Sequence, residues 1–73
     1  MHIEYDREND TAYVSLVAHI AGGAAVRQIP VEGFGAGAEV LLDVDESGRL
    51  LGIEVIGAGG ALPVEVLEQS ATG

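Results

Sequence analysis

The amino-acid sequence predicts an α+β domain, built as an antiparallel β meander of four to five strands with one short C-terminal helix. Three observations lead to this fold class. Short segments rich in β-branched and aromatic residues recur along the chain, glycine-containing or acidic turns separate them, and a proline precedes the last apolar segment. The chain has 73 residues, which is enough for one domain. We assign this domain to residues 1–69 and expect residues 70–73 to form a frayed tail.

An N-terminal hairpin is predicted from a change in residue pattern. Ile3 and Tyr5 alternate with polar neighbours, and this period of two marks a half-buried strand. The polar run Asp6–Asp10 indicates a turn. Thr11–Val17 is rich in β-branched and aromatic residues and is therefore the returning strand.

A third strand is predicted after the break at Gly22–Gly23. It covers Ala25–Val31, where Pro30 favours an edge position or the end of a strand. The next segment, Glu32–Ala38, alternates glycine with other residues and is expected to be a loop.

The clearest strands are Val40–Asp45 and Arg49–Ile56, joined across residues 46–48. Such a three-residue connection is typical of a type I turn followed by a left-handed glycine. If Asp45 pairs with Arg49, apolar side chains fall on both faces of the hairpin. The register places Val40, Leu42, Val44, Leu50 and Ile56 on one face, and Leu41, Leu51, Ile53 and Val55 on the other. We therefore expect other strands or another subunit to cover the second face.

The C-terminal segment predicts a loop followed by a helix. Gly57–Gly60 is expected to be the loop. Pro63 suits the first turn of a helix, which Val64–Gln69 continues with a narrow apolar stripe. Because a helix this short is not stable alone, we expect it to dock on the sheet or on a partner.

Size and composition favour self-association. A chain of this length buries a thin core and usually needs a disulfide, a metal or a partner subunit. The chain has no cysteine, which removes disulfides and thiolate metal sites. We therefore expect a homo-oligomer.

The charge of the chain limits its external partners. Three basic and twelve acidic residues give a net charge of −9, which repels nucleic acid and anionic lipid. A basic protein is the external partner that this charge favours. Residues 1–6 lack the basic start and apolar run of a secretory signal, and the apolar segment Val14–Val26 is shorter than the roughly 20 residues that cross a bilayer. We expect a cytoplasmic protein without nucleic-acid or membrane partners.

Two segments carry a family resemblance. The first, Ile3–Leu16, begins Ile-Glu-Tyr-Asp and ends Asp-Thr-Ala-Tyr-Val-Ser-Leu; the second, Asp43–Ile56, contains Asp-x-Asp-x-x-Gly-x-Leu-x-Gly-Ile-Glu. With the late Leu62-Pro63, this pattern resembles the YuzE-like family, a small bacterial domain of unknown function, over roughly residues 1 to 67. The middle segment, Val17–Ala38, is richer in alanine and glycine than the family pattern. The resemblance implies a compact sheet-plus-helix domain and carries no reaction, cofactor or ligand. An association of family members with genes resembling small ribonuclease toxins would imply an antitoxin or accessory role.

One segment is similar to a calcium-binding loop. Asp43, Asp45, Ser47 and Glu54 take positions 1, 3, 5 and 12 of the EF-hand pattern, and a glycine takes position 6. Hard oxygen ligands at this spacing suit Ca²⁺, but an EF-hand loop lies between helices, whereas the flanks here read as strands. In a hairpin we expect Asp43 and Asp45 to point to one face and Glu54 to the other, which favours a plain polar turn.

Two glycine-rich segments are weaker candidates for ligand binding. Gly33–Ala38 fits Gly-x-Gly-x-x-Ala, with Glu54 at a suitable distance for a ribose contact, but it lacks the helix that must follow a dinucleotide-binding turn. Gly57–Gly60 leads toward a helix and could offer amides to an anion. The acidic side chains near it, Glu54, Glu65 and Glu68, would oppose a phosphate.

Catalytic chemistry has little support. His2 shares a strand face with Glu4 and Asp6, which would suit a metal or an acid–base pair, while nothing in the sequence orients His2 or His19. Ser15 and Ser47 have no identifiable base. We assign no catalytic residue, no cofactor and no metal site.

We therefore expect a non-enzymatic, homo-oligomeric protein-interaction module, acting as an antitoxin-like or scaffolding domain for a basic partner. One alternative is a calcium-binding domain that uses the Asp43–Glu54 segment. Another is a small oligomeric enzyme or small-molecule-binding protein, with a site between subunits formed from His2, Glu4, Asp6 or Glu54.

Overall fold

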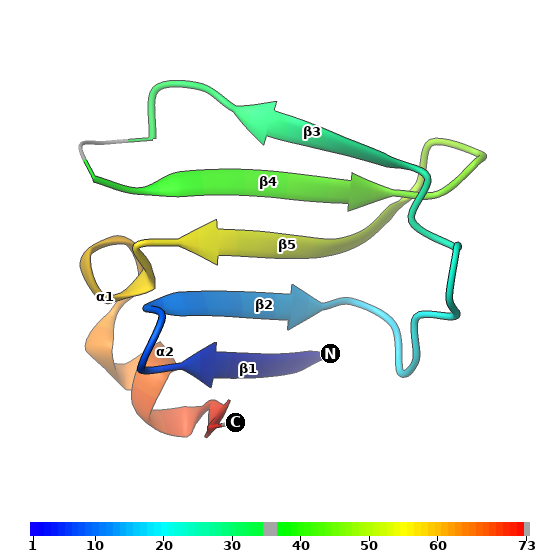
Figure 1. The fold of residues 1–73 in the computed structure, drawn as a ribbon. Helices are drawn as coiled ribbons and strands as arrows, with labels where there is room; N and C mark the ends of the chain where they lie inside the picture. The colour runs from blue at the N-terminus through cyan, green and yellow to red at the C-terminus, as the bar shows by residue number, and fades with distance from the viewer. Residues whose placement is uncertain (35–36, 73) are drawn as a thin grey trace.

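A computed structural model describes residues 1–34 and 37–72 of the chain (Figure 1). In chain order, the described elements are β1 (His2–Asp6), β2 (Thr11–Ser15), β3 (Arg27–Val31), β4 (Glu39–Val44), β5 (Leu50–Ile56), α1 (Ala58–Ala61), α2 (Val64–Gln69) and β6 (Ala71–Thr72). The α+β class predicted from the sequence is confirmed. The helices lie together at one end of the sheet (Figure 1).

The strands of the described residues form one sheet in the order β3-β4-β5-β2-β1-β6. Neighbouring strands are antiparallel except for β6, which runs parallel to β1. A simple meander would place β2 beside β3, but here β2 pairs with β5. The physical reason is the long connection over residues 16–26, which passes the ends of β5 and β4 before β3 begins (Figure 1). Crossing three strand spacings needs roughly 14 Å, well within the reach of eleven residues.

The C-terminal part contains one more helix than the sequence predicted. The expected helix over residues 64–69 is confirmed as α2, which follows Pro63. The segment Gly57–Gly60, expected to be a loop, instead supplies the N-cap, Gly57, and the first three residues of the single turn of α1. In the expected frayed tail, residues 70–73, Ala71–Thr72 form β6 beside β1, and residue 73 lies outside the described residues.

A β-bulge in the central hairpin corrects the predicted register. Asp43 lies opposite Gly52, whereas Val44 lies opposite Leu50, so β5 carries one extra residue at Leu51. The extra residue shifts the alternation of side chains by one position. Ile53 therefore shares a face with the apolar residues of β4, and the predicted separation of these two sets onto opposite faces is wrong.

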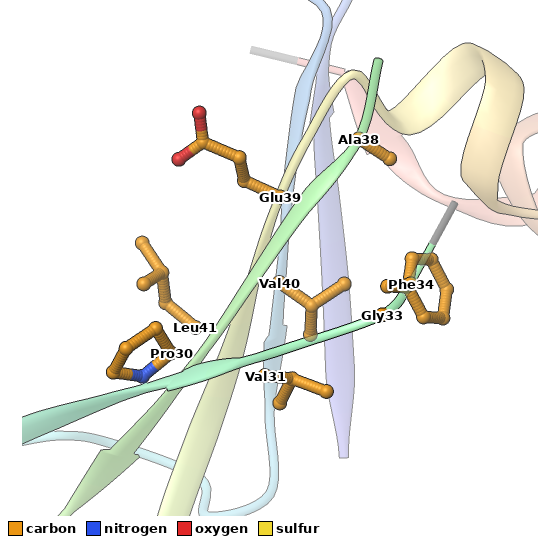
Figure 2. A pocket seen from close by; sticks show the side chains of 8 residues that line it. All are labelled: Pro30, Val31, Gly33, Phe34, Ala38, Glu39, Val40 and Leu41. Atoms are coloured by element: carbon orange, nitrogen blue, oxygen red, sulfur yellow. The ribbon is translucent and has the colours of Figure 1, made fainter. Parts of the chain in front are cut away.

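As a result of the bulge, the sheet has one apolar and one acidic face. Across β1 to β5, paired positions on the apolar face are Ile3, Tyr5, Ala12, Val14, Arg27, Ile29, Val31, Val40, Leu42, Val44, Leu50, Ile53 and Val55. Those on the acidic face are His2, Glu4, Asp6, Thr11, Tyr13, Ser15, Gln28, Pro30, Glu39, Leu41, Asp43, Gly52, Glu54 and Ile56. Figure 2 shows this separation at the β3–β4 hairpin, where Val31 and Val40 project to one side and Glu39 and Leu41 to the other.

The core lies between the helices and one end of the apolar face. Its buried members in the described residues are Ala12, Val40, Val55, Ala58 and Leu67. Tyr5 and Ile53 pack against this cluster and stay partly exposed. No large side chain among the described residues is fully buried. The helices therefore cover only part of the apolar face.

Asp10 fastens the helical segment to the sheet. This residue has a φ of 53°, in the left-handed region, so its backbone carbonyl and its side chain both face α1. The carbonyl accepts hydrogen bonds from the amides of Gly57, at 2.9 Å, and Ala58, at 3.0 Å. Asp10 Oδ1 accepts from the amide of Gly59 at 2.8 Å and from the hydroxyl of Tyr5 at 2.9 Å. The turn between β1 and β2 thus satisfies the first amides of a helix that begins 48 residues later in the chain.

Replacing Asp10 should separate the helices from the sheet. Asp10→Ala removes both side-chain hydrogen bonds, and alanine lacks the polar side chain that lets Asp and Asn tolerate the left-handed region, so we expect a loss of about 3 kcal/mol in the free energy of unfolding. Asp10→Asn keeps an acceptor oxygen and tolerates the same φ, so its loss should be about 1 kcal/mol. Urea unfolding followed by circular dichroism measures both. Equal stability of the two variants would contradict the role given to the Asp10 side chain.

Candidate functional site

The centre of the acidic face is a hydrogen-bonded group that joins three strands. The Tyr13 hydroxyl in β2 donates to Asp43 Oδ2 in β4 at 2.8 Å, across the intervening strand β5. Asp43 Oδ1 accepts from Gln28 Nε2 in β3 at 3.0 Å. Both oxygens of the Asp43 carboxylate are therefore engaged within the protein.

Gly52 makes this arrangement sterically possible. It lies between Tyr13 and Asp43 in the middle of β5, and a β-carbon at this position would clash with the hydroxyl and ring of Tyr13. The tyrosine side chain thus covers a glycine that contributes no side chain to the sheet. We did not predict this group from the sequence. A glycine inside an otherwise regular strand pattern was the signal that could have indicated it.

The environment of Tyr13 keeps its hydroxyl protonated. Burial, the hydrogen bond to Asp43 and the negative charges of Asp43 and Glu54 together raise the pKa of Tyr13 to about 12. At neutral pH the hydroxyl is therefore a hydrogen-bond donor and not a general base. Its chemistry is suited to holding strands together.

Carboxylates surround this group. Those on the described strands of the acidic face are Glu4, Asp6, Glu39, Asp43 and Glu54. No arginine or lysine occupies a strand position on this face within the described residues, since Arg7 and Arg49 flank turns and Arg27 lies on the apolar face. A shallow hollow of about 230 Å³ runs over part of the face and is lined by Glu4, Asp6, Tyr13 and Glu54 among others. Such a surface attracts cationic groups.

The residues of the calcium-loop pattern have separate hydrogen-bonding roles, and Asp43 belongs to the Tyr13 group described above. Asp45 Oδ1 accepts hydrogen bonds from the amides of Ser47 and Arg49, each at 2.9 Å, and so closes the β4–β5 turn. The bulge brings Glu54 to the same face as Asp43, which corrects the expectation that they point to opposite faces. Nevertheless, no group of three or more His, Asp or Glu side chains in residues 1–34 and 37–72 could hold a metal ion.

The candidate histidines are exposed, and the hydroxyl of the candidate Ser15 is hydrogen-bonded to the backbone. His2 pairs with Ser15 across β1 and β2, a neighbour that sequence reasoning did not identify. The His2 ring lies 3.3 Å from Glu4 Oε1, but both side chains are more than half exposed, at 57% and 66%. The Ser15 hydroxyl donates to the carbonyl of Val17 at 2.6 Å, so its proton is not directed to the imidazole. His19 lies exposed in the connection between β2 and β3.

The two glycine-rich segments that were candidates for ligand binding differ in what the structure places around them. Gly35 and Ala36 of the Gly33–Ala38 motif lie outside the described residues, but the flanking elements are the antiparallel strands β3 and β4, not a strand and a helix. A hollow of about 350 Å³ adjoins this hairpin, next to the 43% exposed side chain of Phe34 (Figure 2). In the segment Gly57–Gly60, the amide of Gly59 does bind an anion, which is the carboxylate of Asp10, while the amides of Gly57 and Ala58 donate to the Asp10 carbonyl.

The uncovered part of the apolar face is the second prominent surface. One row of aliphatic side chains crosses the sheet from β3 to β1, and we call it the aliphatic row; it consists of Ile29, Leu42, Ile53, Val14 and Ile3. All five side chains are half-buried. Leu16, Val31 and Leu50 are exposed, at 38%, 38% and 39%.

None of the described helices is long and apolar enough to span a membrane.

Comparison with known proteins matches most of the chain to a family that has no assigned activity. Residues 2–58 match a family described as a protein of unknown function, DUF2283. This match includes all of the strands β1 to β5 and the start of α1. Neither a curated protein nor a solved structure matches the chain. The narrower resemblance to YuzE-like proteins stays a prediction.

The environment of Tyr13 can be tested by titration. Tyr5→Phe leaves Tyr13 as the only tyrosine in a chain without tryptophan, so absorbance near 295 nm reports its ionisation alone. We expect a midpoint at about 12 in this variant. Adding Asp43→Asn should lower the midpoint toward the usual value of about 10, because the negative charge beside the hydroxyl is removed.

The same shift predicts how stability depends on pH. Since the folded pKa is raised, the unfolded chain loses its Tyr13 proton first as pH rises. The stabilising contribution is complete below about pH 10 and is lost as the pH approaches 12. A Tyr13 midpoint near 10 in the Tyr5→Phe variant would contradict the burial and hydrogen bonding described here.

Proposed function

The chain belongs to the DUF2283 family, whose function is not established, and we propose that it is a non-enzymatic, homo-oligomeric protein-interaction module acting in the cytosol. The observation that carries this proposal is the aliphatic row, which crosses five strands without a second layer to bury it. Contiguous apolar surface of this kind is typical of protein-interaction sites.

The accessible surface of the chain supports the proposal. A folded monomer of 7.5 kDa is expected to expose about 4,250 Å², whereas this chain exposes 4877 Å². Its radius of gyration of 12.2 Å also exceeds the roughly 11 Å expected for a compact domain of 73 residues. The chain is therefore less compact than a typical monomeric domain of its size.

The residues of the acidic face support a binding role more than a catalytic one. The Tyr13 hydroxyl is held protonated, the Ser15 proton is bonded to the backbone, and the Asp43 carboxylate accepts hydrogen bonds from side chains of β2 and β3. These contacts join strands or satisfy the backbone, and they leave the Ser15 hydroxyl without a base to activate it as a nucleophile.

A second role is favoured by the acidic face itself. We propose that this face scaffolds or neutralises a basic protein, as an antitoxin-like domain would. Five carboxylates on the described strands, together with a net charge of −9, would attract arginine- or lysine-rich surfaces.

Self-association is tested by the mass of the chain in solution. Size-exclusion chromatography with multi-angle light scattering should give a multiple of 7.5 kDa at micromolar concentration. The physical reason is that the aliphatic row is buried only when another copy covers it. A folded species with the mass of one chain would overturn the homo-oligomer proposal.

Binding of a basic partner is tested with an arginine-rich peptide in calorimetry at low salt. The double variant Glu4→Gln/Glu54→Gln removes two charges from the acidic face and should weaken binding about tenfold, since each charge adds to the attraction. A matched control is Glu65→Gln/Glu68→Gln, which removes two exposed charges from α2. If the two double variants bind equally well, the acidic face is not the docking surface.

A further inference from the structure

Among the described residues, the surfaces that could join two copies are the sheet edges at β3 and β6, the acidic face and the uncovered part of the apolar face. These surfaces differ in their free backbone hydrogen-bond donors and in their charge.

The outer edge of β3 is blocked by Pro30. This residue pairs with Leu41 in the middle of the hairpin, and a proline nitrogen carries no hydrogen. An incoming strand would therefore miss a donor at the centre of β3, where sheet extension needs one. At the opposite edge, β6 has two residues, which is too short to template another sheet. The edges do not favour a continuous sheet through two copies.

The acidic face is excluded by charge. Packing two copies through it would oppose five carboxylates with five more and would bury some of them without a cationic partner. By contrast, the paired strand positions on the apolar face contain no acidic residue, and their one charged residue, Arg27, lies at the margin. In a chain with a net charge of −9, this is the face on which two copies meet with the least repulsion.

We infer that two copies of this chain pack face to face through the part of the apolar face that α1 and α2 leave uncovered. The inference rests on the proposed self-association and adds its geometry, a two-layer β-sandwich in which the aliphatic rows of the two sheets interlock. Both acidic faces then point outward and stay available to other partners.

The area available is sufficient for such a dimer. The whole chain exposes about 600 Å² more than a compact monomer of its mass, and burying an equal area on each of two copies would remove about 1,200 Å² from water. A specific interface should clear about 1,000 Å² in total.

Symmetry makes the interface sensitive to single substitutions. In an isologous dimer, each residue of the patch appears on both sides, so one change is repeated across the two-fold axis. Leu42 lies in β4, next to the centre of the aliphatic row and away from the helices. Leu41, its neighbour in the same strand, lies on the acidic face.

This pair of neighbours provides a matched test. Leu42→Glu should weaken dimer formation at least a hundredfold, because it places two carboxylates in an apolar interface, and the chain should run with the mass of a monomer. Leu41→Glu adds the same charge to the same strand on the other face and should keep the wild-type mass. Sedimentation equilibrium measures both, and circular dichroism verifies that each variant is folded.

A milder pair decides the question if Leu42→Glu does not fold. Ile29→Ser and Pro30→Ser change adjacent residues of the edge strand, one on each face. We expect dimer formation to weaken about tenfold for Ile29→Ser and to remain unchanged for Pro30→Ser.

The outcomes distinguish the face-to-face geometry from the proposal that the chain self-associates. A monomeric wild-type chain overturns both. A wild-type oligomer that survives both Leu42→Glu and Ile29→Ser overturns the face-to-face geometry and leaves self-association intact. Loss of the oligomer in Leu41→Glu, or in Pro30→Ser, also overturns the geometry, because these changes leave the apolar face unaltered.

Discussion

The fold depends on the hydrogen bonds that Asp10 makes to the start of α1. A turn of helix that begins Ala-Gly-Gly has little tendency to form alone, and here its first amides are bonded by a residue from the opposite end of the chain. This connection positions Ala58, the least exposed residue of the core, and directs the chain toward α2 and its buried Leu67. The helices in turn bury Ala12, Val40 and Val55, so the small core of the chain is assembled around one polar contact.

The β-bulge at Leu51 determines what remains exposed. With the extra residue in β5, Ile53 and Val55 join Val40 and Leu42 on the apolar face, and Glu54 joins Tyr13 and Asp43 on the other face. Charge and apolar surface are thereby separated on a sheet that only two short helices cover. Self-association through one face and electrostatic recognition through the other are compatible, because neither uses the residues of the other.

Local pattern was sufficient to predict β1 to β5 and α2. The alternation around Ile3 and Tyr5, the polar turn before Thr11 and the proline before Val64 all correspond to elements of the structure. These features depend on residues close in sequence, where side-chain period and turn chemistry act directly.

The features that sequence reasoning missed depend on residues far apart in the chain. The pairing of β2 with β5 brings Tyr13 onto Gly52, and α1 forms because Asp10 reaches it. The position of the bulge decided which face each residue of β5 joins, and a shift of one residue reverses every such assignment. The shared face of Asp43 and Glu54 likewise follows from the bulge, which the residue pattern did not locate. The pairing of His2 with Ser15 follows from the register of the β1–β2 hairpin.

The most direct test of this account is the dependence of the thermal midpoint on protein concentration. If folding and association are coupled through the apolar face, a hundredfold dilution should lower the midpoint by about 10 °C, because a dimer of this size unfolds to two chains with an enthalpy of about 100 kcal/mol. A midpoint that is independent of concentration, in a chain that unfolds reversibly as a monomer, would show that the partly covered sheet is stable by itself and would contradict the account.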